Sequence, residues 1–455
     1  MPKRLVYIVW YKVGSLDLIL PITARIRQVH PDIHLTILVA ELNKSYLIRS
    51  GRFYKFFCKK HNIELLDMLD FLPVGLHPFI GLIRYFVNYP ARDGKTNHKL
   101  YDFISAFIGN LIGKLIQHNK IRDYLNESTL LMNEQWWDQL NILDCIPLNK
   151  TILLVPHGPV YLCYPDVVID QKTIQHHKHI LFQSGQYTGI LYDALMPQNK
   201  HVVLPYDRVK VPIHSLGVFN NSTQYHQDEE ILVERLAFVG APCFDTKWFE
   251  YVFELLQTDQ QIKQIVPKKG KRFRCLFLMR DVVETDQSKK VTLTDFKIIL
   301  QTIIDEILHP YDCEIIIKPH PRQSPYKLRQ ILKQFNLKEY IIVDDNIAIT
   351  LLESDVAVTV HTSGSYYPMI FGIPCIHIYK RDYPNQPLYN EMEQTLQRVV
   401  FNLEDLPQIC AKLMHDLVHG NPVPNDVEHM RKFYPDGSIE LVMEQLRPYL
   451  EGDSE

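Results

Sequence analysis

The 455-residue sequence lacks several features that mark common protein classes. Its 8 cysteines form no CxxC pair, which excludes a zinc ribbon or a disulfide framework and predicts reduced, buried thiols and no metal site. No run reaches the ~18 apolar residues of a membrane-spanning helix. Only 18 residues are glycine, below the usual share of about 7%. Glycine-rich phosphate loops are therefore not expected in number.

The sequence also lacks an excess of charge of either sign. Lys and Arg number 49, Asp and Glu number 52, and the formal net charge is -3. A general nucleic-acid-binding protein needs a surplus of basic charge against phosphates, so we expect no nucleic-acid partner. Hydrophobic residues make up 46% and charged residues 22%, as in soluble globular proteins. The sequence therefore predicts a cytoplasmic location, and any anion site must be local.

The order of apolar runs predicts an α/β fold. Residues 5–9 and 34–40 are β-branched, strand-like runs, and residues 18–28 between them have helical spacing. A strand, a helix and a strand within about 40 residues indicate a βαβ unit and a parallel sheet. The second half repeats this alternation with five strand candidates. These are residues 275–279, 313–317, 340–343, 356–360 and 375–378.

A polar, basic stretch at residues 261–274 is the best candidate for a domain boundary. We therefore expect an N-terminal domain over residues 1–265 and a C-terminal domain over residues 270–425. Residues 75–125 interrupt the α/β alternation and are predicted to form a helical insertion in the first domain.

Four short motifs follow predicted strands, where parallel sheets place their ligand sites. They are His157-Gly158, the GAPCFD run at residues 240–245, the KPHPR run at residues 318–322 and the HTSGS run at residues 361–365. The fourth motif leads directly into a predicted helix. Its hydroxyl and backbone N–H groups are those that bind a phosphate at a helix N-terminus, although plain N-capping explains the same residues.

The third motif favours a phosphate site. Its two prolines hold His320 and Arg322 in an extended turn, from which the imidazole can donate a hydrogen bond to a phosphate and the guanidinium can bind it bidentately. Arg280, directly after the strand at residues 275–279, is a further candidate for phosphate contact or a plain surface arginine.

The ordered set of motifs resembles the GT-B class of nucleotide-donor transferases. The likeness is to the CDP-glycerol glycerophosphotransferase-like enzymes and to bacterial capsule and sialyl-transferring enzymes. It implies two Rossmann-like domains facing a cleft, with the donor bound by the C-terminal half and the acceptor by the N-terminal half. The segment at residues 433–438 resembles the one that leads a last helix back to the first domain, so residues 426–455 are expected to cross back.

The resemblance also implies roles for individual residues. His157 corresponds to the proposed catalytic base, and His320 corresponds to the histidine at the donor phosphates. The hydroxyl-rich turn supplies further phosphate contacts, and the loop after the first strand lies on the acceptor side. The turn residues are Thr362, Ser363, Gly364 and Ser365, and the acceptor-side residues are Gly14, Ser15 and Asp17.

The predicted reaction is an inverting transfer of a sugar or glycerol phosphate to a surface glycan or glycolipid acceptor. The sequence has no DxD pair after a suitable strand, so we expect no metal and no cofactor beyond the nucleotide-activated donor. That donor is left open among CMP-, CDP- and UDP-linked compounds. Two alternatives remain: a non-hydrolysing UDP-sugar 2-epimerase, and a non-catalytic scaffold of the same fold.

Residues 101–119 carry apolar side chains in pairs four apart, the stripe of an amphipathic helix. Lys114, His118, Lys120 and Arg122 flank this stripe. One interpretation is a helix packed on its own domain. The other is a basic helix that lies on an anionic membrane through residues 101–122, which makes the protein peripheral at the inner face of the membrane.

Overall fold

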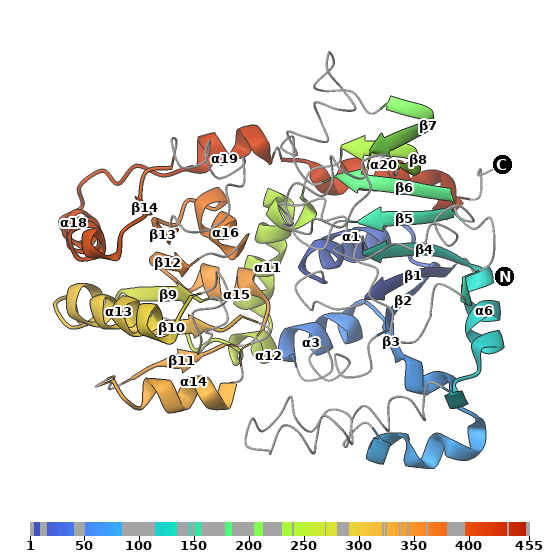
Figure 1. Ribbon diagram of the computed structural model, residues 1–455, viewed down its shortest axis with the longest axis horizontal. Coiled ribbons are helices and arrows are strands. Elements are labelled where there is room, and N and C mark those ends of the chain that lie inside the picture. The colour runs from blue at the N-terminus through green and yellow to red at the C-terminus, as the bar shows by residue number, and fades with distance from the viewer. Residues whose placement is uncertain are drawn as a thin grey trace. The chain divides into compact units, whose positions relative to one another are not determined.

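The computed structural model describes most of the chain in separate stretches (Figure 1). They are residues 4–9, 16–40, 51–83, 114–133, 145–146, 151–155, 178–183, 204–212, 230–238, 241–268, 270–279, 291–320, 323, 325–335, 337, 339–343, 345–360, 363–379, 396–434 and 436–451. The chain divides into two compact units. The first contains Met1–Ser50, Tyr54–Trp248 and Tyr434–Glu455, and the second contains Gly51–Phe53 and Phe249–Phe433.

The first unit is built on an eight-stranded sheet with the order β3-β2-β1-β4-β5-β6-β8-β7. All neighbouring strands pair in parallel except β7 and β8, which are antiparallel. Its elements are β1 (Arg4–Val9), α1 (Leu16–Val29), β2 (His34–Val39), α3 (Arg52–Lys60), β3 (Ile63–Asp67), η3 (Met68–Phe71), η4 (Val74–Phe79), α6 (His118–Asn126), β4 (Ser128–Asn133), β5 (Thr151–Val155), β6 (Lys178–Gln183), β7 (Leu204–Pro212), β8 (Glu230–Phe238), η6 (Pro242–Phe244) and α20 (Ser438–Glu451). Helix α3 begins with two residues that belong to the second unit.

The second unit is built on a six-stranded, wholly parallel sheet with the order β11-β10-β9-β12-β13-β14. Its elements are α11 (Thr246–Thr258), which begins in the first unit, α12 (Gln260–Lys263), β9 (Arg274–Leu278), α13 (Leu293–Ile303), the π-turn η7 (Ile304–Leu308), β10 (Glu314–Lys318), α14 (Pro325–Leu332), β11 (Ile341–Ile342), α15 (Ile347–Leu352), β12 (Val356–Val360), η8 (Ser363–Ser365), α16 (Tyr366–Ile370), β13 (Cys375–Ile378), β14 (Val399–Val400), η9 (Leu403–Asp405), α18 (Leu406–Val418) and α19 (Val427–Phe433).

The first six strands of each unit have the same order when the strands of each unit are counted separately, and β8 and β7 extend the first sheet beyond its sixth strand. In each, the first three strands run 3-2-1 and the chain then crosses to add strands 4, 5 and 6 on the other side. This is the doubly wound order of Rossmann-like domains. The predicted α/β fold with two Rossmann-like sheets is confirmed.

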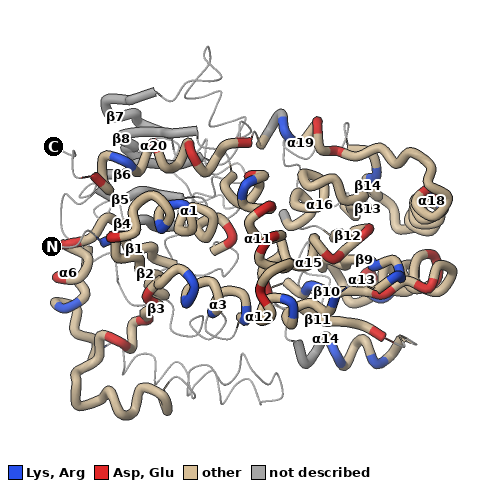
Figure 2. The backbone as a smooth tube through the Cα atoms, turned by 180° about the vertical axis from the view of Figure 1, so that it is seen from behind, with Lys and Arg blue, Asp and Glu red and all other residues tan. Residues whose placement is uncertain are grey.

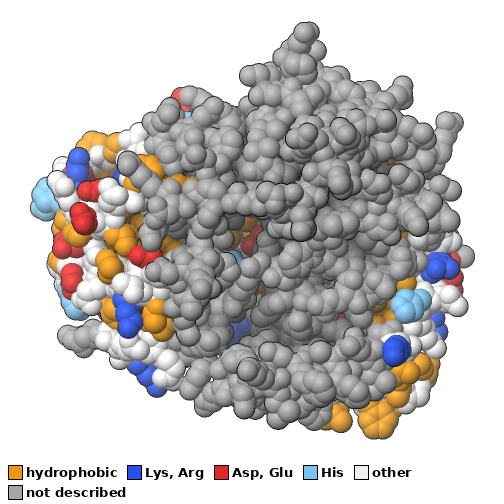
Figure 3. All heavy atoms as spheres, in the orientation of Figure 1, with side chains coloured by type: hydrophobic (Ala, Val, Ile, Leu, Met, Phe, Trp, Pro, Cys, Tyr) orange, Lys and Arg blue, Asp and Glu red, His pale blue; other side chains and the backbone are white. Residues whose placement is uncertain are grey.

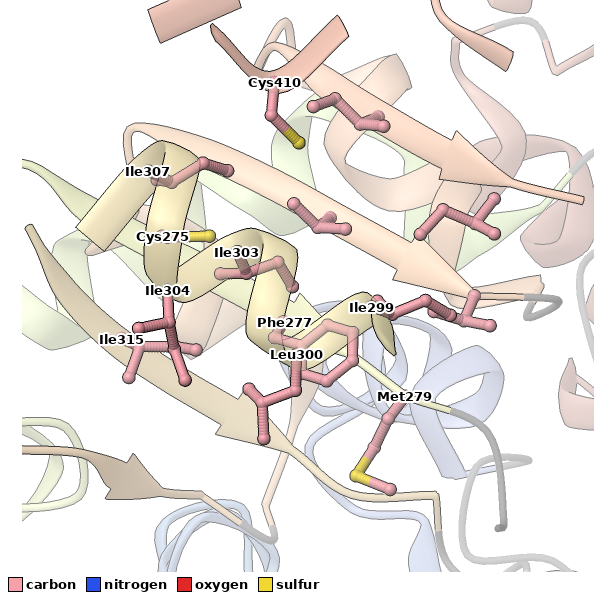
Figure 4. Close-up of a cluster of buried hydrophobic side chains, with 14 of the residues drawn as sticks. Cys275, Phe277, Met279, Ile299, Leu300, Ile303, Ile304, Ile307, Ile315 and Cys410 are labelled. Atoms are coloured by element: carbon pink, nitrogen blue, oxygen red, sulfur yellow. The ribbon is translucent and has the colours of Figure 1, made fainter. Parts of the chain in front are cut away.

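The core of the second unit explains why its strands could be recognised in the sequence. All five residues of β9 and of β12 are buried, as expected for parallel strands covered on both faces. Figure 4 shows Cys275 and Phe277 of β9 packed with Ile299 and Ile303 of α13, and Cys410 of α18 closes the same cluster.

The cysteines follow the predicted pattern of burial. Cysteines 58, 145, 243, 275, 313, 375 and 410 are all buried, and Cys163 lies outside the described residues. Burial raises the pKa of Cys410 to about 12, so this thiol stays protonated and packs as a small apolar side chain.

The C-terminal segment returns to the first unit, as predicted. Helix α19 ends in the second unit at Phe433, and α20 then packs against α1 and η6 in the first. The GAPCFD motif holds this return in place. The buried carboxylate of Asp245 accepts the backbone N–H of Lys247 at 3.0 Å, and its other oxygen accepts that of Ile439 at 3.0 Å.

A reciprocal contact completes this junction, because the carboxylate of Asp436 accepts the backbone N–H of Thr246 at 2.8 Å. One aspartate therefore caps the start of both α11 and α20, and a second reinforces the start of α11. The sequence grouped residues 240–245 with the ligand motifs. The contacts of Asp245 assign it a structural role instead.

The division between the units differs from the boundary expected at residues 261–274. The chain passes from one unit to the other inside α11, between Trp248 and Phe249, so a helix and not a polar linker makes the connection. The basic stretch lies within the second unit. Its last residue, Arg274, is 1% exposed and bonds to Glu314 at 2.6 Å.

Most of the predicted helical insertion lies outside the described residues, including residues 84–113. The described part comprises η4, the turns beside it and α6, whose Ile121 and Leu125 are buried. In the stretches that the structure describes, no helix is both long enough and apolar enough to cross a membrane.

Candidate functional site

The carboxyl edge of the second sheet is the place where its topology favours a ligand. The strand order reverses between β9 and β12, and open parallel sheets bind ligands at such a switch point. Leu278 of β9 pairs with Lys318 of β10 on one side and with Thr359 of β12 on the other. The three strands therefore end level. Because neighbouring strands lie about 4.8 Å apart, the segments after β10 and β12 begin about 10 Å from each other.

The segment after β10 is fixed by its own backbone and by Lys318. The Lys318 Nζ atom donates to the carbonyl oxygen of Asp345 at 2.5 Å, and the N–H of Met279 donates to the carbonyl of Lys318 at 3.3 Å. Gln323 then donates its N–H to the carbonyl of His320 at 2.8 Å, which turns the chain. His320 is half-buried in this turn. Arg322 lies outside the described residues.

Asp345, which sequence analysis passed over, organises the segment after β11. Its buried carboxylate accepts the N–H of Phe53 at 3.1 Å and that of Asn346 at 2.9 Å. Burial raises the pKa of Asp345 in spite of these hydrogen bonds. The side-chain oxygen of Asn346 accepts the N–H of Ala348 at 2.9 Å and starts α15. The Asp-Asn pair before an apolar helix was the available sequence signal for this capping arrangement.

The segment after β12 enters a 3-10 turn, Ser363–Ser365, before the short helix α16. Ser365 is buried and makes no side-chain hydrogen bond as an N-cap, while Gly364 is half-buried. Helix α16 has only five residues, so its dipole adds little to an anion site. What this turn can offer a phosphate is mainly its hydroxyl and backbone N–H groups. The side chains of Thr362 and Ser363 lie outside the described residues.

Of two further predicted site residues, Asp17 is described by the structure and Arg280 is not. Arg280 lies outside the described residues, directly after buried Met279 at the end of β9. Asp17 is described: it is buried in the first turn of α1, and its Oδ1 atom accepts the Tyr54 hydroxyl at 3.0 Å. Gly14, Ser15 and His157 all lie outside the described residues.

His377 of β13 lies in the second sheet and is a core residue. It is buried, and its Nδ1 atom is 2.9 Å from the hydroxyl of Thr359 on β12. Burial lowers the pKa of His377 from 6.5 to about 4, so the ring is neutral in the folded protein at neutral pH.

This burial predicts a loss of stability in acid. Between pH 6.5 and 4 the unfolded chain holds a proton on His377 that the folded protein does not, so the free energy of unfolding falls as the pH falls. The contribution lost between pH 7.5 and 5 is about 2 kcal/mol. Denaturant unfolding followed by circular dichroism at both pH values measures this loss. His377→Gln should remove that part of the pH dependence, and an unchanged slope would contradict the assignment.

Among the residues that the structure describes, no group of three or more His, Cys, Asp or Glu side chains is placed to hold a metal ion. The described part of the candidate site consists of turns at a sheet edge, held by backbone hydrogen bonds and by Lys318.

Comparison with known proteins identifies the fold. No family model and no curated protein matches the chain. MnaA of S. aureus, in a co-structure with UDP, is 12% identical over 99% of this chain and 97% of its own, with a TM-score of 0.50. UDP-GlcNAc 2-epimerase from Neisseria meningitidis, bound to UDP-GlcNAc, is 10% identical over 98% of this chain and 99% of its own, also with a TM-score of 0.50. The wall teichoic acid polymerase TagF is 9% identical over 99% of this chain and 89% of its own, with a TM-score of 0.49.

At these identities the likeness shows the fold. The chain has the two-unit α/β architecture of the GT-B type.

Proposed function

We propose that this protein is a metal-independent, inverting transferase that moves a sugar or glycerol phosphate from a nucleotide-activated donor to a surface-glycan acceptor. One observation carries the proposal: β10, β9 and β12 end level at the switch point. The turn containing His320 and the turn at Ser363–Ser365 therefore border one edge of the sheet. A donor phosphate lying over the end of β9 reaches donors from both turns.

The reaction requires a base at the acceptor and groups that stabilise negative charge at the departing nucleotide phosphate. A base removes the proton of an acceptor hydroxyl, whose oxygen forms the new bond to the transferred group. The bond to the nucleotide phosphate breaks, and its electron pair leaves with that phosphate. His320, Arg322 and the hydroxyl turn stabilise this departing charge, and Arg280 adds a further cation. His157, which follows β5 in the sequence, is the proposed base, with Gly14, Ser15 and Asp17 on the acceptor side.

The first test is a thermal-shift screen of the full chain with CMP, CDP, UDP and GDP. A ligand that binds only the folded state raises the melting temperature, by an amount equivalent to about 2.7 kcal/mol at a concentration 100 times its Kd. We expect one of these nucleotides to do so. The UDP and UDP-GlcNAc bound by the two structural neighbours make the uridine nucleotide the first to try. No shift with any of them would contradict the proposal and favour a non-catalytic scaffold.

A second candidate is a non-hydrolysing UDP-sugar 2-epimerase, favoured by the likeness to the Neisseria enzyme over nearly the whole length of both chains. An epimerase needs acidic residues around the sugar. Buried carboxylates near the carboxyl ends of described strands, Asp17 and Asp345 among them, already accept hydrogen bonds from Tyr54 and from backbone N–H groups. Incubation with UDP-GlcNAc and no acceptor separates the two functions, because only an epimerase converts the free nucleotide sugar.

A further inference from the structure

An uncharged segment of the first unit exposes large apolar side chains. Residues 71–83 contain no Lys, Arg, Asp or Glu. Phe71 and Ile80 are buried and anchor the segment. Between and beyond them, Val74, Phe79 and Leu82 are 69%, 55% and 56% exposed. Single exposed apolar side chains are ordinary, but three within nine residues form a patch that is costly to leave in water.

A second segment adjoins this one and extends the patch. The N–H of Gln117 donates to the carbonyl of Phe71 at 3.1 Å, and the rings of Phe71 and Tyr124 lie 5.7 Å apart. The stretch that leads into α6 is thereby held beside η3 and η4. Leu115 in this stretch is 40% exposed. Val74, Phe79, Leu82 and Leu115 make up what we call the apolar patch, and Figure 3 shows hydrophobic side chains gathered at the lower right of the molecule, beside Lys, Arg and His side chains.

The charged residues directly beside Leu115 and along the start of α6 are basic. Residues 114–122 include Lys114, Lys120 and Arg122 and no acidic residue. All three are exposed, as is His118. The acidic residues that follow are exposed Asp123, directly after Arg122, and Glu127, the C-cap of α6. Figure 2 shows blue Lys or Arg colouring on the tube at α6 and an uncharged, tan stretch of tube below it.

We propose that the apolar patch and the basic start of α6 dock the protein on an anionic lipid bilayer. Phe79, Leu82 and their neighbours enter the boundary between headgroups and acyl chains, and Lys114 and Lys120 contact the negative headgroups. A bilayer fits both halves of this surface at once. Exposed apolar side chains enter a soft apolar medium, and the basic side chains beside Leu115 and at the start of α6 favour a surface of the opposite sign. This docking is independent of the proposed transferase activity.

Flotation of the full-length protein with lipid vesicles tests the proposal. We expect binding to vesicles that contain phosphatidylglycerol and little binding to pure phosphatidylcholine. The double variant Phe79→Ser/Leu82→Ser should bind the anionic vesicles at least about tenfold less. The matched control is Phe253→Ser/Ile298→Ser, which removes two side chains of similar exposure, 49% and 45%, from the second unit. It should bind like the wild type.

A second double variant tests the basic side chains, and it keeps the proposal testable if Phe79→Ser/Leu82→Ser fails to fold. Lys114→Glu/Lys120→Glu changes only exposed side chains and should weaken binding by about fivefold or more per lysine. Lys412→Glu, at an exposed site on α18, is its control. Binding of the wild type should also fall as salt is added, because the attraction between exposed charges is screened.

Three outcomes overturn the proposal. The first is a wild-type protein that does not float with anionic vesicles. The second is binding that survives both double variants. The third is a lipid-free dimer that Phe79→Ser/Leu82→Ser converts to a monomer, measured by light scattering, because the apolar patch would then be an interface between two copies of the chain.

Discussion

Arg274→Met is expected to lower the free energy of unfolding by about 3 kcal/mol. Arg274 opens β9, is 1% exposed, and bonds to Glu314 at 2.6 Å, to Glu353 at 3.5 Å and to the carbonyl of Pro267 at 2.8 Å. Methionine fills a similar volume but leaves two partly buried carboxylates without their cation. Removing one member of a buried ion group costs more than the group contributes as a whole, since the remaining charges stay desolvated.

Two further variants show whether charge is the cause. The triple variant Arg274→Met/Glu314→Gln/Glu353→Gln removes the stranded charges and should recover much of the loss. Arg272→Met, two residues earlier, breaks exposed pairs with Asp312 and Glu339 and should change stability far less. Denaturant unfolding of all three, with the wild type, measures the differences. Equal losses for Arg272→Met and Arg274→Met would show that burial of the ion group is not the cause.

The second large effect separates the two proposed site histidines. His157→Ala should lower turnover by about 10²–10⁴-fold and leave nucleotide affinity nearly unchanged, because a general base acts on the acceptor. His320→Ala should weaken nucleotide binding by about ten- to a hundredfold and slow transfer as well, because it removes a charge-assisted hydrogen bond to the donor phosphate. Calorimetry with the nucleotide found in the screen, and turnover with the acceptor, measure both effects.

Each unit supplies one control histidine for the His157→Ala and His320→Ala variants. His34→Ala alters a half-exposed histidine at the amino end of β2, and His309→Ala alters an exposed one after η7. Both should keep wild-type affinity and turnover. A loss of nucleotide affinity in His157→Ala, or full turnover in that variant, would contradict its assignment as the base. Unchanged affinity in His320→Ala would remove that residue from the donor site.

The sequence predicts strands such as β1, β9 and β12 well because nearly all of their residues are buried, which makes each an apolar run. The expected strand at residues 356–360 coincides with β12, and that at residues 5–9 differs from β1 by one residue. The edge strand β7, Leu204–Pro212, is harder to predict. It pairs antiparallel with β8 and carries polar residues and a proline at either end, so no apolar run marks it.

The sequence predicts where the turns of the candidate site lie along the chain, but not which contacts their side chains make. The turns after β10 and β12 could be located because each follows a recognisable strand. What the side chains do in these turns depends on residues distant in sequence. Lys318 reaches the carbonyl of Asp345, 27 residues away, and Asp245 reaches Ile439, 194 residues away. No local pattern encodes such partners, so a motif read as a ligand site proved to be a helix cap.

The return of the chain to the first unit at Tyr434 sets the order in which the two units are completed during synthesis. Residues 249–433, nearly all of the second unit, leave the ribosome before the helix that completes the first. At about 5–20 residues per second this takes roughly 10–40 s. Throughout that interval the face of α1 that α20 covers remains bare, and the nascent first unit holds an apolar surface on which a chaperone can act.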